Sequence, residues 1–600
     1  MNDNVFGSQI RRSILKYTII GFTVLVIFQL FKMQLLENYL YQEKSLENSV
    51  KKEMIPAPRG VFYDRNFKVI VSNKPAFTIE ILPSEYDINH NQLVENVLQV
   101  KEGHIKNLLE QNKGYSPYIP IKIKRNTHFE FIAWLQENKE KLNGLDYEVE
   151  LQRDYSFGIK GSHFFGYTKE LSAEQYKRLK SIYDLGDYIG FSGLEKTYED
   201  LLRGEKGYTL TLVDSRQRTI GRYREGAEDK APTKGHDLIL GIDAQTQLLA
   251  EKLFEGKTGA LVALEPATGE IIAFVSAPQY DLSKFASVTS SQYWDSLRTD
   301  ENKPIFNRAT QSIYPPGSTF KMLVALAALD AGIINENFTV NCGGGYQFGD
   351  RYFKCLHVHG RVNVVDAIKE SCNTFFYQLI LKIGLERFAK YAREFGFGQK
   401  SGVDIPGEIS GILPDSSYYN RVYGKGKWTR GFLVSLGIGQ GELSATPLQL
   451  AKYTALIGNN GRSVQPHFVR AYIDKNTSEV VPLDFEEIKL DINQKALDLV
   501  KEGMFKVVNE PGGTATMVKL PDIEISGKTG TAQNPHGKDH ALFVAYAPSE
   551  NPQIAVAVVV ENVGYGSTHA APIAREVIKT YLQKDKKEIP SEEKIAGIKN

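Results

Sequence analysis

The chain has 600 residues, of which 42% are hydrophobic and 24% charged, and its formal net charge is +1. This length allows more than one domain, and the composition is typical of folded domains with apolar cores rather than of a disordered chain. The nearly neutral charge gives no indication of nucleic-acid binding, and the three cysteines are too few for a disulfide scaffold.

An apolar segment near the N-terminus is the first predicted element. Residues 17–31, YTIIGFTVLVIFQLF, carry no charge. Extended over residues 13–36, the segment is long enough to cross a bilayer, and no small-residue cleavage site follows it, which favours an anchor over a signal peptide. Three basic residues precede it: Arg11, Arg12 and Lys16. They predict that the short tail 1–12 faces the cytoplasm and that the rest of the chain lies outside.

The region from residue 37 to residue 234 is mixed and polar. It contains short alternating strand patterns (AFTIEIL, YIPIKIK, YEVELQR) and a helical pattern, HFEFIAWLQENKEKL. In PAPRGVFYDRN, Arg59, Asp64 and Arg65 surround a glycine, and FSGLEKTYEDLLRGEKG predicts one amphipathic helix. We find no catalytic cluster in this region, and a packed network of salt bridges is the interpretation that we favour for both segments.

The pattern changes at residue 235 and defines a domain over residues 235–584. GALVALEPATGEIIAFVSAP predicts two strands joined by a tight turn, and HALFVAYAPSENPQIAVAVVVEN predicts a second such pair. Short connections require antiparallel pairing. The predicted class is therefore α+β, with one antiparallel sheet built from both ends of the domain and helices on its faces. The charged tail 585–600 is expected to be loosely held.

The stretch YPPGSTFKMLVALAAL contains a lysine inside an apolar run. Pro-Pro-Gly ends any helix from upstream, Ser318 suits a helix start, and the run from Phe320 predicts a buried helix. Lys321 then lies one turn from Ser318 on the same face. Burial lowers the pKa of a lysine, and a neutral amine can take the proton of a serine hydroxyl. Ser-x-x-Lys alone is nevertheless common by chance.

Two further motifs make the interpretation specific. KESCNTFF contains Ser371 and Asn373, and ISGKTGTAQ contains the run of residues 528–531. Ser-x-x-Lys, Ser-x-Asn and Lys-Thr-Gly, in this order within one domain, form the signature of the penicillin-recognising serine acyltransferases. The three motifs together are far more specific than any one of them.

Longer stretches resemble the class B penicillin-binding proteins of the elongation type. In the C-terminal region these are YPPGSTFKM, IGQGELSATPLQLA and GALVALEPATGEIIAFVSAPQYD, and in the N-terminal region PRGVFYDRN and GLEKTYEDLLRG. The resemblance covers nearly the whole chain. It implies a transmembrane helix over 13–36, an extended pedestal domain of the dimerisation type over 37–234, and a transpeptidase domain with the fold of the serine β-lactamases over 235–584. It also implies a single-pass protein of the cytoplasmic (inner) membrane with its catalytic domain in the periplasm.

The resemblance implies a serine-type D-Ala-D-Ala transpeptidase that crosslinks peptidoglycan stem peptides during cell elongation and is inhibited by β-lactams. Ser318 would be the nucleophile, Lys321 the general base, and Ser371 the group that passes a proton to the leaving D-alanine. Asn373 would position Lys321. Lys528 would be a further catalytic residue, which helps to hold the substrate carboxylate. The positions that would bind the substrate are Thr529, Gly530 and Thr531.

The partners that the resemblance implies are stem peptides, β-lactams, a polytopic SEDS-type (RodA-like) glycosyltransferase and an MreC-like elongation scaffold. The region before residue 235 shows no acidic motif of a glycosyltransferase, so polymerisation is expected of a partner. Four alternatives remain: a division-type transpeptidase, a D,D-carboxypeptidase, a β-lactamase, and a membrane scaffold that has kept the fold. The anchor and pedestal argue against a β-lactamase, and the complete motifs argue against a scaffold.

The three cysteines lie in one stretch, with a histidine among them. Cys342, Cys355, His359 and Cys372 supply three thiolates and an imidazole, a donor set typical of a structural zinc site. Some elongation-type members of the family are similar, with zinc at matching places. The alternatives are a Cys342–Cys355 disulfide or buried free thiols. Two residues are possible substitute ligands, His357 and, less favourably, Asp350. No organic cofactor is expected.

Other side chains near the motifs are assigned lesser roles. Tyr314 and Trp428 are expected to line the cleft. Asn307 and Arg308 are expected to pack rather than to react, and no catalytic role is assigned to His540.

Overall fold

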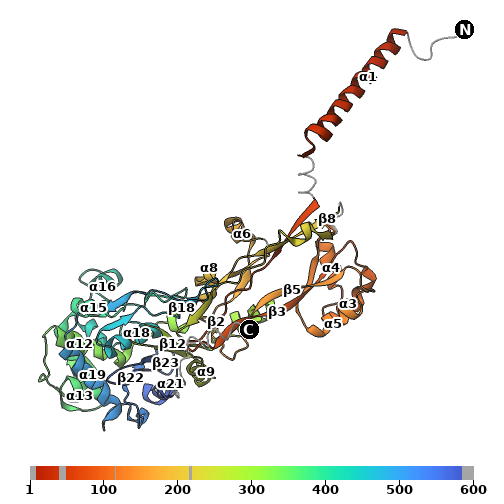
Figure 1. Ribbon diagram of the computed structural model, residues 1–600. Coiled ribbons are helices and arrows are strands. Elements are labelled where there is room, and N and C mark those ends of the chain that lie inside the picture. The colour runs from red at the N-terminus through yellow and green to blue at the C-terminus, as the bar shows by residue number, and fades with distance from the viewer. Residues whose placement is uncertain (1–8, 40–48, 115, 185, 215–218, 584–600) are drawn as a thin grey trace. The chain divides into compact units, whose positions relative to one another are not determined.

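The computed structural model describes residues 9–39, 49–114, 116–184, 186–214 and 219–583 (Figure 1). Residues 1–8 of the predicted cytoplasmic tail and the predicted tail 585–600 lie outside the described residues.

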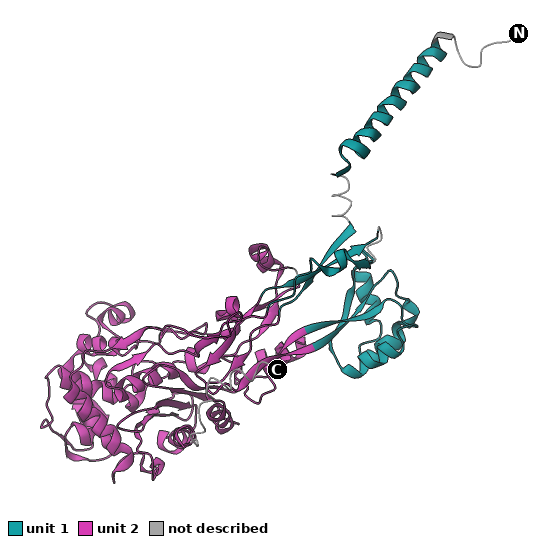
Figure 2. Cartoon of the chain, viewed as in Figure 1, with its two compact units in different colours: residues 1–57, 76–150, 205–233 teal, residues 58–75, 151–204, 234–600 magenta. Residues whose placement is uncertain are grey.

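The chain forms two compact units, which Figure 2 colours separately. Unit 1 comprises residues 1–57, 76–150 and 205–233. Unit 2 comprises residues 58–75, 151–204 and 234–600. Two stretches of the predicted pedestal, 58–75 and 151–204, therefore belong to the same compact unit as the C-terminal region. The predicted domain boundaries stay a prediction.

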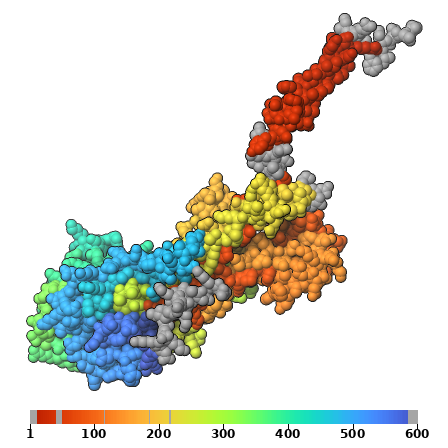
Figure 3. Space-filling model, viewed as in Figure 1, coloured from red at the N-terminus to blue at the C-terminus, as the bar shows by residue number. Residues whose placement is uncertain are grey.

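The predicted apolar helix is confirmed as α1 (Gln9–Phe31), which continues into a short π-helix, η1 (Lys32–Leu36). Among the described residues it is the single helix long and apolar enough to cross a membrane, over Arg11–Leu36. None of that stretch is buried, and Figure 3 shows its side chains uncovered along the visible face. Apolar side chains that no part of the chain covers need another apolar environment.

Besides α1, the described part of unit 1 contains strands of two sheets and three helices that pack against one of them. The first sheet has the order β1 (Val50–Ile55), β8 (Gly207–Val213), β9 (Thr219–Arg222). In the second sheet, the end of β3 (Val69–Ile81) pairs with β4 (Ile121–Thr127) and β5 (Leu145–Asp154). The helices that pack against this sheet are α3 (Asn91–Leu98), α4 (His104–Gln111) and α5 (Phe129–Glu137). Their shared core includes Ile79, Val94, Ile105, Phe131 and Leu135. The strands predicted in this region are thus confirmed.

The core of unit 2 is a five-stranded antiparallel sheet with the order β12-β11-β23-β22-β21. The strands are β11 (Gly259–Leu264), β12 (Ile271–Ala277), β21 (Ser526–Ala532), β22 (His540–Ala547) and β23 (Ile554–Val560). Pairing of β11 with β23 joins the two predicted hairpins, so the prediction of one sheet from both ends of the domain is confirmed.

Helices cover both faces of this sheet. Every residue of β11, β12 and β23 is buried, and because successive strand residues point to opposite faces, neither face is open to solvent there. The covering helices are α9 (Ala244–Leu253), α18 (Pro447–Gly458), α20 (Gly566–His569) and α21 (Ala571–Leu582). Strands of a second sheet in the same unit follow the order β19 (Val480–Pro482), β18 (Val469–Ile473), β10 (Asp237–Leu240), β2 (Phe62–Tyr63) and the start of β3.

The predicted buried helix is confirmed as α12 (Lys321–Asp330), whose first eight residues are all buried. It does not begin at the serine, because a 3-10 turn, η5 (Gly317–Phe320), precedes it. Neighbouring helices enclose it: α13 (Val364–Lys369), α14 (Asn373–Ile383), α15 (Leu385–Glu394) and α19 (Gln494–Asn509). Two short antiparallel strand pairs lie between α12 and α13, formed by β13 (Val340–Cys342) with β16 (Gly360–Val362) and by β14 (Gly345–Phe348) with β15 (Arg351–Lys354).

The single amphipathic helix predicted over residues 191–207 is wrong. The structure has two short helices, α7 (Gly193–Thr197) and α8 (Glu199–Leu202), interrupted at Tyr198. Tyr198 leaves the helical conformation, and its hydroxyl donates to the partly buried carboxylate of Asp404 at 2.8 Å. A tertiary hydrogen bond has here overridden the local helical pattern.

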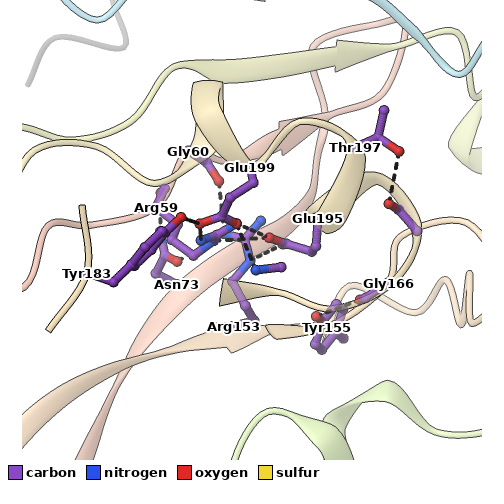
Figure 4. Close-up of polar contacts among 12 residues, drawn as sticks. Arg59, Gly60, Asn73, Arg153, Tyr155, Gly166, Tyr183, Glu195, Thr197 and Glu199 are labelled. Atoms are coloured by element: carbon purple, nitrogen blue, oxygen red, sulfur yellow. Dashed lines mark hydrogen bonds and ion pairs between the residues drawn. The ribbon is translucent and has the colours of Figure 1, made fainter. Parts of the chain in front are cut away.

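The predicted packing role of the two segments of the pedestal is confirmed as a buried ion network (Figure 4). Arg59 donates to Glu195 at 2.7 Å and to Glu199 at 2.7 Å. Arg153 donates to the other oxygen of Glu195 at 2.6 Å and to the carbonyl of Gly60 at 2.9 Å. The two arginines and two glutamates neutralise one another, so burial of the charges is tolerated.

Candidate active site

Ser318 lies in η5, against the strand that carries the Lys-Thr-Gly motif. The residue before it, Gly317, has φ +57°, and a Cβ there would meet the carbonyl oxygen of Thr531 at 2.6 Å. The N–H of Gly317 donates to Gly439 at 2.8 Å. Residue 317 must therefore be glycine for two reasons, its positive φ and its close approach to β21. Ser318 itself is partly exposed, and its carbonyl accepts the N–H of Lys321, so the two residues share one turn.

Lys321 is fully buried, with three oxygen atoms around its amine. Its Nζ lies 2.7 Å from the carbonyl oxygen of Ser371, 3.1 Å from Ser371 Oγ and 2.6 Å from Asn373 Oδ1. Burial lowers the pKa of Lys321 to about 7, although the charges of Cys355 and Cys372 act to raise it. None of the three contacting oxygens carries a full charge, so the ammonium gains no counter-ion there. A neutral amine is therefore available near neutral pH.

Ser371 connects two buried lysines. Its Oγ accepts from Lys321 at 3.1 Å and from Lys528 at 3.0 Å. Lys528 is fully buried, and burial, together with the charge of Lys321, lowers its pKa well below the ordinary value. Ser371 has φ +58°, a strained conformation for a residue other than glycine, of the kind that clusters at functional sites. The arrangement can pass a proton between either lysine and a group bound next to the hydroxyl.

The Lys-Thr-Gly motif lies on β21, the edge strand of the sheet. Thr529 Oγ1 lies 2.9 Å from Thr514 Oγ1, and Gln440 donates to the carbonyl of Thr531 at 3.1 Å. A Cβ at Gly530 would meet Thr319 Cγ2 at 2.7 Å. The glycine thus serves the packing of η5 on β21, and a close approach of substrate backbone at this position stays a prediction.

The three cysteines and His359 meet beside the Ser371 turn. Their sulfur and nitrogen ligand atoms all lie within 4.8 Å of one another, and all three cysteines are free. His359 Nδ1 lies 3.4 Å from Cys342 Sγ and 3.5 Å from Cys355 Sγ. The donor set is that of a closed tetrahedral metal site, and it can hold a metal ion. His357 and Asp350, the predicted substitutes, do not belong to this cluster.

Hydrogen bonds and burial shift the pKa values of the three cysteines in different directions. Hydrogen bonds from the Cys372 thiol and from the N–H groups of Thr374 and Asn373 lower the pKa of Cys355 to about 3, against the opposing effect of burial. Burial raises the pKa of Cys342, but hydrogen bonds from Thr374 and His359 outweigh it, and the net direction is downward. The pKa of Cys372 is raised because its proton bonds to Cys355 and its sulfur is buried.

Other predicted residues have mixed outcomes. Tyr314 does not line an open cleft, because it is 4% exposed and donates to Glu561 at 2.6 Å. Trp428 is partly buried, and its indole N–H donates to Asn420 at 2.9 Å. The predicted packing role of Asn307 and Arg308 is confirmed, since Asn307 caps α11 (Arg308–Gln311) and Arg308 binds Glu561.

Three residues near the site were not identified from the sequence: Gln440, Thr514 and Glu561. Gln440 lies in the IGQGELSATP stretch, which carries the resemblance, so it had a usable signal. Thr514 and Glu561 belong to no motif.

An antiparallel sheet flanked by helices, with these three motifs gathered at its edge, is the arrangement typical of a penicillin-recognising serine acyltransferase. Residues 259–579 match the family model of the penicillin-binding protein transpeptidase domain, and residues 54–240 match that of the penicillin-binding protein dimerisation domain. The chain belongs to the penicillin-binding protein family.

Curated relatives and solved structures agree with this assignment. The peptidoglycan D,D-transpeptidase MrdA of Acinetobacter baumannii is 34% identical over 91% of this chain and 84% of its own length. A penicillin-binding protein (PBP2) solved in complex with MreC from Helicobacter pylori is 29% identical, with a TM-score of 0.75 over 89% of this chain and 99% of that chain. A chain of a peptidoglycan synthase complex that coordinates polymerization and crosslinking is 28% identical, with a TM-score of 0.73 over 96% of this chain and 99% of that chain.

Proposed function

We propose that this protein is a peptidoglycan D,D-transpeptidase that crosslinks stem peptides during cell elongation. The observation that carries the proposal is the contact of buried Lys321 with Ser371 and Asn373, one turn from Ser318, in a chain related to MrdA over most of its length. The family alone does not separate elongation from division, but the MrdA relatives and the PBP2 neighbours support elongation.

The first half-reaction forms an acyl-enzyme. Ser318 Oγ attacks the carbonyl carbon between the two terminal D-alanines, and neutral Lys321 accepts the hydroxyl proton. The negative charge on the carbonyl oxygen is held by the backbone N–H groups of Ser318 and Thr531, and one such donor contributes about 3 kcal/mol. The C–N bond then breaks, and a proton delivered through Ser371 leaves with the terminal D-alanine.

The second half-reaction transfers the acyl group. An amine of a neighbouring stem peptide attacks the ester carbonyl and gives up a proton to Lys321. The bond between the carbonyl carbon and Ser318 Oγ then breaks, and Lys321 returns the proton to that oxygen. Lys528, Thr529 and Thr531 hold the substrate carboxylate, and the stem peptide adds along the edge of β21 as an extended strand. A β-lactam follows the same first step and leaves a stable ester on Ser318.

The test of the function is labelling with a fluorescent penicillin, followed by peptide mapping of the adduct. We expect one adduct per chain on Ser318 and none in Ser318→Ala. An adduct on another residue, or labelling of Ser318→Ala, contradicts the proposal. Depletion of the protein that yields filaments instead of rounded cells contradicts the elongation role.

We propose that Cys342, Cys355, His359 and Cys372 hold a structural zinc ion. Cys372 lies between Ser371 and Asn373, so an ion bound there fixes the turn that presents three oxygens to Lys321. When bound, the ion supplies cross-linking of loops rather than Lewis-acid chemistry, since all four coordination positions are filled by protein. Native mass spectrometry with and without chelator tests this: we expect one zinc per chain, whereas a metal-free mass lower by two hydrogens indicates the disulfide.

We propose that α1 anchors the protein in the cytoplasmic membrane with its N-terminus in the cytoplasm and its remainder in the periplasm. The basic residues in the N-terminal part of α1 and its uncovered apolar side chains support this topology. Because similar chains were solved with MreC and in a peptidoglycan synthase complex, we propose an MreC-like scaffold and a SEDS-type (RodA-like) glycosyltransferase as partners. Protease protection in spheroplasts and co-purification from membranes are the corresponding measurements.

A further inference from the structure

A nearly buried carboxylate lies beside the segment that leads into Ser318. Tyr314 donates its hydroxyl proton to Glu561 Oε1 at 2.6 Å, and Arg308 donates from Nε to the same oxygen at 3.1 Å. Tyr314 and Arg308 are 4% and 5% exposed, and the side chain of Glu561 is 17% exposed. A carboxylate in such a place needs both partners, because a buried charge without them is costly.

Glu561 is held firmly from the side of the sheet. It directly follows β23, and its N–H donates to the carbonyl of Thr258 at 2.8 Å. Arg308 is fixed as well, since its two Nη groups donate to the carbonyls of Asn302 at 2.7 Å and Lys303 at 3.2 Å. The carboxylate therefore has a defined position relative to the central strands.

Tyr314 keeps the hydroxyl proton that it donates to the Glu561 carboxylate. Burial, together with the charge of Glu561, raises the pKa of Tyr314, so the phenol keeps its proton at neutral pH. The ring also packs edge-on against His540, the first residue of β22, with centroids 5.5 Å apart. Both the hydroxyl and the ring thus tie Tyr314 to ends of sheet strands.

The position of Tyr314 is transmitted to the nucleophile through a stiff connection. Two prolines separate Tyr314 from Gly317, and each fixes its own φ near −65°. The main chain of Tyr314 exchanges hydrogen bonds with Ala445 at 3.0 and 2.9 Å. The segment between Tyr314 and Ser318 is therefore rigid, so a displacement of Tyr314 also displaces Ser318.

We propose that Glu561 and Tyr314 are positioning residues for the nucleophile. Their hydrogen bond fixes the start of the segment that leads to Ser318 against the end of β23, and it thereby sets the distance between the Ser318 turn and β21. The proposal rests on the function proposed for Ser318. It assigns neither residue a contact with substrate. A shift of about 1 Å at a reacting atom can cost about a hundredfold in rate, so even a small loosening is measurable.

The test is Tyr314→Phe in the full-length protein, which removes one oxygen atom and keeps the ring. We expect the first-order acylation step with a fluorescent penicillin to slow about tenfold while pre-covalent binding stays unchanged. Glu561→Gln keeps an acceptor for the phenol and loses the charge opposite Arg308, so we expect a smaller decrease. The amplitude of labelling counts the folded molecules, so the rate constant is independent of folding yield.

Tyr198→Phe is the matched control, because its hydroxyl also donates to a partly buried carboxylate, Asp404, at 2.8 Å in the same unit. We expect it to lower the melting temperature without slowing acylation. The proposal is overturned if Tyr314→Phe acylates at the wild-type rate, or if Tyr198→Phe slows acylation equally. Loss of labelling in Ser318→Ala, with no change in Tyr314→Phe, leaves the proposed function intact and removes only this inference.

Discussion

Two of the clusters of buried cations in unit 2 differ in what surrounds them. Within the described residues, the hydrogen bonds of Lys321 and Lys528 go to neutral oxygen atoms, whereas Arg59 and Arg153 donate to the carboxylates of Glu195 and Glu199. Burial acts to lower the pKa in both clusters. It prevails for Lys321, whose pKa falls to about 7, but the glutamates outweigh it for Arg59, whose pKa is raised. A cation that is buried without a counter-charge thus becomes a reactive neutral amine, whereas a cation that is buried with a counter-charge stabilises the fold.

Lys321→Arg should have the largest effect on the chemistry. A guanidinium keeps its proton in proteins, so the variant keeps a cation at this place and loses the base. We expect the acylation rate to fall about a thousandfold, within the range of general-base contributions. Stopped-flow labelling measures it, with exposed Lys495→Arg as the control. A rate within about tenfold of wild type contradicts the role of the neutral amine.

Gly317→Ala tests whether the turn must lie against β21. A Cβ at residue 317 meets the Thr531 oxygen at 2.6 Å, whereas one at Gly332, which has a similar φ of +64°, meets nothing within 4 Å. Both variants carry the same backbone strain of about 1 kcal/mol, so their difference isolates the clash. We expect acylation to slow about a hundredfold in Gly317→Ala and to remain unchanged in Gly332→Ala. Equal rates in the two variants contradict this account.

Glu195→Gln should leave the chemistry of the folded protein unchanged and lower its stability. The substitution removes one of two carboxylates facing Arg59 and Arg153, and breaking a buried pair costs about 3–5 kcal/mol. The control is Glu174→Gln in the exposed pair with Arg178, for which we expect at most about 0.5 kcal/mol. Chemical denaturation compares them. Similar losses in the free energy of unfolding of both variants contradict a stabilising role of the buried ion network.

The sequence predicted the parts of the site that short motifs encode. Ser318, Lys321, Ser371, Asn373 and the run 528–531 do lie together, because each motif carries its own turn or strand. The two hairpins were also predictable, since alternation and short connections specify antiparallel pairing locally. The cysteine cluster was predictable from residue type and spacing, and its four ligand atoms do converge.

Features that depend on distant partners were not predictable. Glu561 lies 247 residues from Tyr314, and no local pattern links them. The break at Tyr198 depends on Asp404, 206 residues away, whereas the local sequence favours a continuous helix. The positive φ of Ser371 is likewise set by the contacts of the folded site and not by its residue type.

The pH dependence of acylation tests the central claim most directly. Because neutral Lys321 is the base, the first-order acylation rate should rise with pH, reach half its maximum where Lys321 is half protonated, at about pH 7, and level off above. The measurement is stopped-flow labelling with a fluorescent penicillin from about pH 5.5 to about pH 9.5, short of the ordinary lysine pKa of about 10.4. An inflection near pH 7 that disappears in Lys321→Arg supports the account. A rate that is flat across this range, or that still rises at its upper end, contradicts it.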